Sequence, residues 1–118
     1  MRGDVFDKLR ILPRIFSLIS EWDLAVFIFV AKVQHLLREN VLMVIASPYE
    51  DIFVDDANVL VVLKEDCLEM RNCVENAARE IEEMFGGRVR ILPLITTPNG
   101  EKISEFIENL EKELSWKE

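Results

Sequence analysis

The stretch VLMVIASPYEDIFVDDANVLVVL, residues 41–63, decides the fold of this chain. It holds two apolar runs, VLMVIA (41–46) and NVLVVL (58–63), which are too short for buried helices and rich in strand-forming residues. Both runs therefore predict strands. Because the second run is apolar throughout rather than alternating, it is typical of a strand buried on both faces of an α/β sheet. Ser47-Pro48 ends the first run, since proline has no amide hydrogen to donate to a strand ladder.

The residues before this stretch favour helices. Segment 4–20 carries apolar residues at helical spacing, and Pro13 predicts a kink or a break in it. A second helix is expected to start with Asp23 as its N-cap and to end at Asn40. Its run LAVFIFVA (24–31) is also typical of a buried strand. We favour a helix, because the run continues into AKVQHLLREN, which is rich in helix-forming residues.

The residues after the stretch predict a helix and a third strand. Asp66 and Glu69 fit a capping-box-like helix start, and Gly86-Gly87 supplies a left-handed cap at the helix end. The run RVRILPLIT (88–96) then predicts a strand. Pro93 within it indicates a strand that lies at an edge of the sheet or ends early.

A last helix is expected to open at Thr97-Pro98. The order of elements predicts one α/β (α+β) domain over residues 1–118, with an N-terminal helical segment (1–22) and an α/β core (23–118). The core should contain a small mixed sheet of three or more strands flanked by helices, with the strands on either side of the long helix parallel. The alternative is a small Rossmann-like three-layer α/β binding domain, in which residues 24–31 add a strand.

Composition excludes several classes of function. With 118 residues and a net charge of -8, the chain is long enough for one core and repels nucleic-acid phosphates, so no direct nucleic-acid binding is expected. The densest apolar run is far shorter than the roughly 20 residues that span a bilayer, and no secretory signal is visible. We therefore expect a cytoplasmic protein that does not enter a membrane. Cys67 and Cys73 are expected to be small buried residues in a reducing compartment, and His35 to have no role as a ligand.

The acidic segment that follows the first apolar run, residues 47–58, is the candidate functional segment, and we call it the acidic arm. Magnesium-dependent phosphate chemistry needs carboxylates that converge on a cation, and two acids spaced Asp-x-Asp on a strand share one face. Here Asp56-Ala57-Asn58 offers one carboxylate and one amide, with Asp55 beside them. Arg90, like Arg88 on the third strand, is placed to supply fixed positive charge or to line a solvated edge. An ordinary acidic loop explains the same residues.

In this order of elements the chain resembles the minimal nucleotidyltransferase domain of the polymerase beta-like family, over roughly residues 23–97. That family has Gly-Ser after its first strand, then Asp-x-Asp leading into an apolar strand, and a third acid on a later strand. Here Ala46-Ser47 stands in the place of Gly-Ser, Asp56-Ala57-Asn58 in that of Asp-x-Asp, and residues 88–96 contain no acid. The resemblance thus implies a degenerate, vestigial metal or nucleotide site. Its members would be Ser47, Asp55, Asp56, Asn58 and Arg90.

The resemblance implies a catalytically inactive or weakened nucleotidyltransferase-like protein that acts through protein–protein interaction and retains, at most, nucleotide binding. Small domains of that family often work beside a helical partner protein, and some are the antitoxin of a toxin pair. We expect a protein partner or a homodimer here, held by large apolar side chains near the N-terminus: Phe6, Leu9, Ile15, Phe16 and Trp22. The alternative is an active enzyme that uses Mg²⁺ and ATP, with Asp56 as metal ligand and Ser47 at the phosphates.

Overall fold

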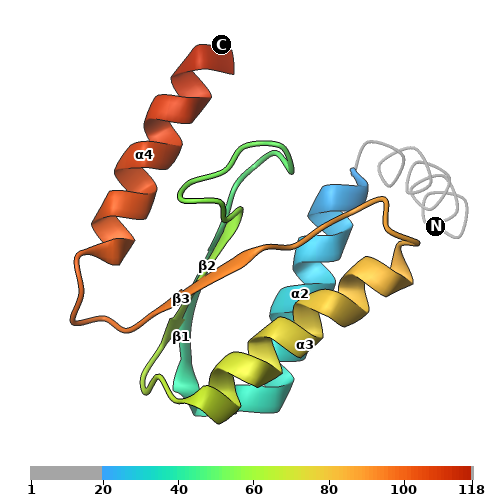
Figure 1. The fold of residues 1–118 in the computed structure, drawn as a ribbon, viewed down its shortest axis with the longest axis vertical. Helices are drawn as coiled ribbons and strands as arrows, with labels where there is room; N and C mark the ends of the chain where they lie inside the picture. The colour runs from blue at the N-terminus through green and yellow to red at the C-terminus, as the bar shows by residue number, and fades with distance from the viewer. Residues whose placement is uncertain (1–19, 118) are drawn as a thin grey trace, which may run out of the picture.

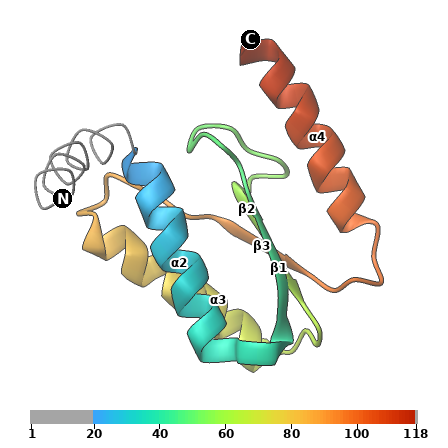
Figure 2. The same cartoon turned by 180° about the vertical axis from the view of Figure 1, so that it is seen from behind.

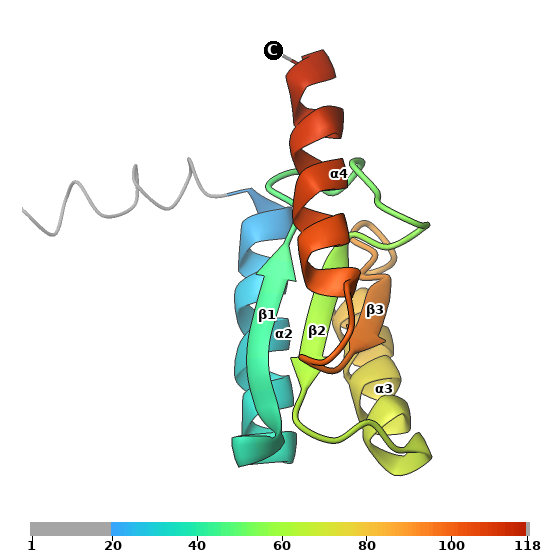
Figure 3. The ribbon, with the colours of Figure 1, turned by 90° about the vertical axis from the view of Figure 1, so that its left-hand side faces the viewer.

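A three-stranded sheet separates two layers of helices in the computed structural model, which describes residues 20–117 and the side chains of residues 20–115 (Figure 1). Helices α2 and α3 cover one face of the sheet, and α4 lies against the other (Figure 3). The elements are α2 (Glu21–Leu37), the short 3-10 helix η1 (Arg38–Asn40), β1 (Val41–Ala46), β2 (Val59–Leu63), α3 (Leu68–Met84), β3 (Pro93–Thr96) and α4 (Lys102–Lys117). The helix expected over 4–20 lies outside the described residues, apart from Ser20.

The sheet has the order β1-β2-β3, with β1 antiparallel and β3 parallel to β2. All five residues of β2 are buried, so the prediction of a central strand covered on both faces is confirmed. The mixed sheet and the parallel relation of the two strands around the long helix are confirmed as well. No residue of β1 is fully buried, although its run is equally apolar, because β1 lies at an edge of the sheet.

Alternate residues of β2 supply two separate cores. Val59, Val61 and Leu63 face α2 and α3, where Phe29 and Ile81 join the larger core. The other two residues of β2 face α4, where Phe106 and Leu110 form a smaller core with the apolar residues of the acidic arm. The smaller core therefore packs α4 against both the sheet and the acidic arm.

Residues 24–31 form the interior of α2, as favoured, so the Rossmann-like alternative with an additional strand is wrong. The expected N-cap is wrong by three positions. Ser20 caps the helix, and its Oγ accepts a hydrogen bond of 3.0 Å from the backbone N–H of Asp23. Asp23 instead lies in the first turn, where its negative charge interacts favourably with the positive end of the helix dipole.

The start of α3 also differs from the expectation. Cys67 occupies the N-cap position and is exposed, contrary to the expectation of a buried cysteine, while Cys73 is half-buried. Asp66 precedes the cap and accepts two hydrogen bonds of 2.7 and 2.6 Å from the guanidinium of Arg71, which lowers the pKa of Asp66. The predicted end is confirmed, because Gly86 and Gly87 follow the helix with φ of 61° and 80°.

The third strand is shorter than predicted. Pro93 begins β3 rather than ending it, and residues 88–92 lead into the strand without belonging to it. The edge position indicated by Pro93 is confirmed. The last helix begins at Lys102 instead of Thr97-Pro98, which lie in a preceding turn. Within residues 20–117 no helix combines the length and the apolar character needed to cross a membrane.

Candidate functional site

Ser47 anchors the start of the acidic arm, directly after β1. Its hydroxyl donates a hydrogen bond of 2.7 Å to the carbonyl of Tyr49 and accepts one of 3.3 Å from the Tyr49 amide. The backbone amide of Ser47 donates a hydrogen bond of 2.9 Å to the Asn58 carbonyl. The Ser47 carbonyl accepts a hydrogen bond of 2.7 Å from the indole N–H of Trp22. Ser47 is buried and its polar atoms all serve local structure. Trp22, expected in an interface, is instead a core residue.

The tip of the arm is a two-residue hairpin turn. Val54 and Ala57 pair across it with reciprocal backbone hydrogen bonds of 2.7 and 2.9 Å. Asp55 and Asp56 between them both have positive φ, 51° and 63°, as the two central residues of a type I′ turn require. Aspartate is among the few side chains that tolerate this conformation. Both side chains are exposed, and aspartate at these two positions is compatible with the geometry of the turn.

Asn58 closes the base of the arm and is completely buried. Its Nδ2 donates to the carbonyls of Arg90 at 2.9 Å and of Glu50 at 3.4 Å, and its Oδ1 accepts from the amide of Leu92 at 2.8 Å. The Glu50 carboxylate accepts a hydrogen bond of 2.7 Å from the backbone amide of Arg90. The side chain of Asn58 thus joins the arm to residues 90–92 just before the β2–β3 ladder begins.

The two arginines of the 88–92 segment turn away from the acidic arm. Arg90 Nε lies 3.7 Å from a carboxylate oxygen of Glu82 on α3. Arg88 Nη2 lies 3.1 Å from Glu21 on α2, and this acid raises the pKa of Arg88. Both guanidinium groups are largely exposed. Arg90 therefore contacts the arm through its backbone, not its charge.

The five candidate residues consequently do not converge. Ser47 and Asn58 lie buried at the base of the arm beside the backbone of Arg90, while Asp55 and Asp56 stand exposed at its tip. Within the described residues, no three His, Cys, Asp or Glu side chains lie close enough together to hold a metal ion. The sequence spacing of Asp56 and Asn58 failed as a guide because the strand starts only at Val59, after the turn. A residue inside a turn and a residue after it do not share a strand face.

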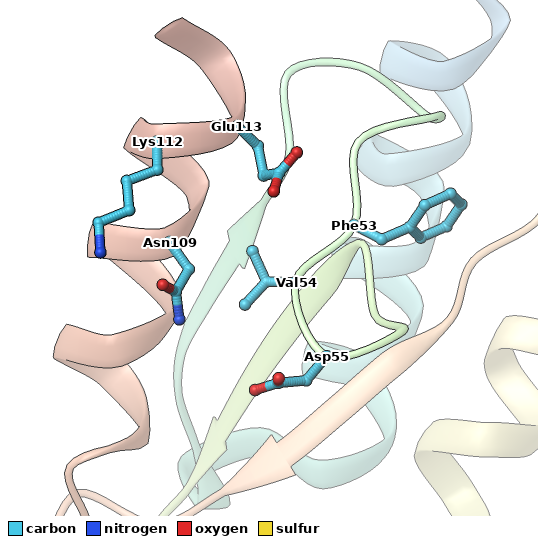
Figure 4. A pocket seen from close by; sticks show the side chains of 6 residues that line it. All are labelled: Phe53, Val54, Asp55, Asn109, Lys112 and Glu113. Atoms are coloured by element: carbon cyan, nitrogen blue, oxygen red, sulfur yellow. The ribbon is translucent and has the colours of Figure 1, made fainter. Parts of the chain in front are cut away.

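A shallow cavity of about 260 Å³ lies between the tip of the arm and α4 (Figure 4). Val54 and Asp55 point from the arm toward α4, whereas the ring of Phe53 points away from it. The cavity is lined by Phe53, Val54, Asp55, Asn109, Lys112 and Glu113. One ammonium group against two carboxylates makes it a poor receptor for a triphosphate. This cavity was not anticipated from the sequence, because Asn109, Lys112 and Glu113 belong to no recognisable motif.

Comparison with known proteins assigns no family. No protein-family model, curated protein or solved structure matches this chain.

Proposed function

We propose that the chain is a non-catalytic protein of nucleotidyltransferase-like architecture that acts by binding another protein. The proposed partner is a second copy of the same chain. The order α2, β1, acidic arm, β2, α3, β3 supports the resemblance in architecture, because it keeps the sequence of elements on which that resemblance rests. The antiparallel β1–β2 pair presents the arm at one end of the sheet (Figure 1).

The observation that carries the proposal is the bonding of Asn58. This residue stands where the second carboxylate of Asp-x-Asp would be, and its amide group is buried and bonded to three backbone groups. A metal ligand there would have to give up these bonds, and each buried backbone group left unpaired costs about 1–3 kcal/mol. A cation at the arm would then have only the carboxylates of Asp55 and Asp56 as ligands. This arrangement supports a structural role for the arm.

Edge strand β1 supports the binding role. Its six residues, VLMVIA, contain no charged or polar side chain, and it has only β2 as a neighbouring strand within the described sheet. Leu42 and Met43 are exposed by 51% and 46% of their surface. Proteins usually protect an edge strand with charges or proline, because its free backbone groups pair with other chains. A bulge interrupts the ladder at Leu42 but leaves residues 43–46 regular, so two copies can pair antiparallel about a twofold axis.

Titration calorimetry tests the absence of catalysis. We expect no heat of binding for millimolar ATP with Mg²⁺ or without it. A Mg²⁺-dependent binding signal that disappears in Asp56→Ala would overturn this part of the proposal and support an active nucleotidyltransferase in its place.

Sedimentation velocity over a wide range of protein concentrations tests whether the chain binds a second copy of itself. We expect the wild-type chain to form a dimer and Met43→Lys to be monomeric, because a lysine on an edge strand blocks pairing. Leu68→Lys is the control, since Leu68 is an exposed apolar residue that belongs to α3 and not to β1. A wild-type monomer at high concentration, or a Met43→Lys dimer, would show that β1 is not the interface.

A further inference from the structure

Helix α2 is the helix that lies nearest to the β1 edge of the sheet. It packs against β1, whereas α3 packs against β3 at the other edge (Figure 3), and the two helices lie side by side on one face of the sheet (Figure 2). The ion pair between Lys32 and Glu80 marks the side of α2 that faces α3. The opposite side of α2 therefore faces the β1 edge, to which the proposed second copy binds.

This side of α2 carries a stripe of residues with the spacing of a helix–helix interface. At 100° per residue, the members of the stripe lie about 140–180° around the helix from Lys32. They follow one another at intervals of four and three residues, as in a coiled coil: Asp23, Phe27, Val30, Gln34 and Leu37. Phe27 is exposed by 72% of its surface, and Val30 and Leu37 are half-buried. The stripe is thus an apolar surface of α2 that a second helix can cover.

The hydrogen bond from Trp22 to the carbonyl of Ser47 fixes the level of α2 relative to β1. The middle of the regular stretch 43–46 lies about two to three residues before Ser47, which is ~7–10 Å at about 3.3 Å per residue. Helix α2 runs opposite to β1, because η1 joins the end of α2 to the start of β1. The same distance along α2, at about 1.5 Å per residue, leads from Trp22 to residues 27–29. A twofold axis through the middle of two paired β1 strands therefore passes α2 at this level.

We propose that the α2 helices of the two copies pack antiparallel beside each other across this axis. The inference rests on the proposed β1 dimer and extends its interface. Residues equally far from the axis then face each other, so Phe27 packs on Val30 of the second copy. Asp23 lies opposite Gln34, whose side-chain amide can donate a hydrogen bond to the carboxylate. The acidic first turn of each helix also lies beside the last turn of the other, which carries His35. The stripe is therefore complementary to itself.

Sedimentation velocity of Phe27→Glu and Leu24→Glu tests the α2 contact. Leu24 is an exposed apolar residue of the same helix, but it lies outside the stripe. We expect Phe27→Glu to raise the dissociation constant of the dimer at least about tenfold, because each dimer loses two buried rings. Leu24→Glu should change it by no more than about twofold. If both variants dimerise like the wild type while Met43→Lys is monomeric, the α2 contact is wrong and the β1 dimer stands. A wild-type monomer at high concentration would overturn both proposals.

Gln34→Lys tests the antiparallel register through a gain of affinity, which misfolding cannot imitate. The substitution places an ammonium group opposite Asp23 of the other copy, twice in each dimer. We expect the dimer to tighten by about 2- to 30-fold at low salt and the gain to shrink at high salt. The gain should be lost when Asp23→Asn is added. No gain, or a gain that survives Asp23→Asn, would overturn the proposed register.

Isotope-filtered NMR on mixed labelled and unlabelled wild-type chains tests the same contact without a substitution. We expect NOEs between the Phe27 ring of one copy and the Val30 methyl groups of the other. A dimer without these NOEs would contradict the proposal even if Phe27→Glu failed to fold.

Discussion

At the scale of single residues, Asn58 shows how a side chain can extend a sheet. Its amide satisfies backbone groups of Glu50, Arg90 and Leu92, and its own backbone N–H donates to the Leu92 carbonyl at 3.0 Å. A side-chain amide can donate hydrogen bonds and accept them at the same time, whereas an ionised carboxylate can only accept them. These bonds account for asparagine at this position without reference to a lost catalytic acid.

Asn58→Asp tests this explanation. The substitution removes the donor to two carbonyls and buries a charge, so we expect a loss of about 2–4 kcal/mol of unfolding free energy at neutral pH. The pKa of the new carboxyl group should be raised in the folded state, so the loss should shrink as the pH falls below that value and the group regains a proton.

Urea unfolding with and without Mg²⁺ measures this effect, with Asn72→Asp on the exposed side of α3 as the control. We expect a small change for the control and none on adding Mg²⁺ to either variant. If Mg²⁺ restored the stability of Asn58→Asp, positions 56 and 58 would share a cation site after all.

At the scale of elements, the conformation of the hairpin turn predicts how substitutions of Asp56 change stability. A non-glycine residue in the left-handed conformation costs about 1 kcal/mol or more, and Asp56 has φ of 63°. Asp56→Gly should therefore raise the unfolding free energy by about 0.5–1 kcal/mol. Asp56→Ala should lower it, because alanine has no side-chain oxygen to support the turn.

Chemical denaturation of the two Asp56 variants and the wild type provides the measurement. A loss of stability in Asp56→Gly as large as that in Asp56→Ala would mean that the carboxylate itself, and not the turn geometry, stabilises the arm.

The elements that the sequence predicted well are those set by long, local patterns. VLMVIA forms β1 with the predicted bounds, NVLVVL gives β2 without its first residue, and Gly86-Gly87 ends α3 as predicted. Helix starts were less predictable, because Ser20 and Asp23 are both good caps and only the backbone decides between them. The run RVRILPLIT is strand-like along its length, but its first half bonds to the arm instead of continuing the β2–β3 ladder.

At the scale of the whole molecule, the fold class and the mixed sheet followed from the sequence, whereas the arrangement of the candidate site did not. Side-chain spacing along the chain predicts which residues share a strand face, but a turn within the acidic arm changes that face. The sequence also gave no sign that Arg88 and Arg90 pair with Glu21 and Glu82 on the helices. Surface ion pairs depend on which helix covers the sheet, and that is a property of the assembled fold.

The hydrogen bond from the Trp22 indole to the carbonyl of Ser47 spans 25 residues of chain and joins α2 to the root of the acidic arm. It gives the molecule a built-in optical reporter. Loosening of the arm would admit water to this ring and shift its fluorescence to longer wavelength, whereas events confined to the hairpin tip would leave the emission unchanged. In a Trp116→Phe variant, which leaves Trp22 as the single tryptophan, movements of the arm can therefore be followed without an added label.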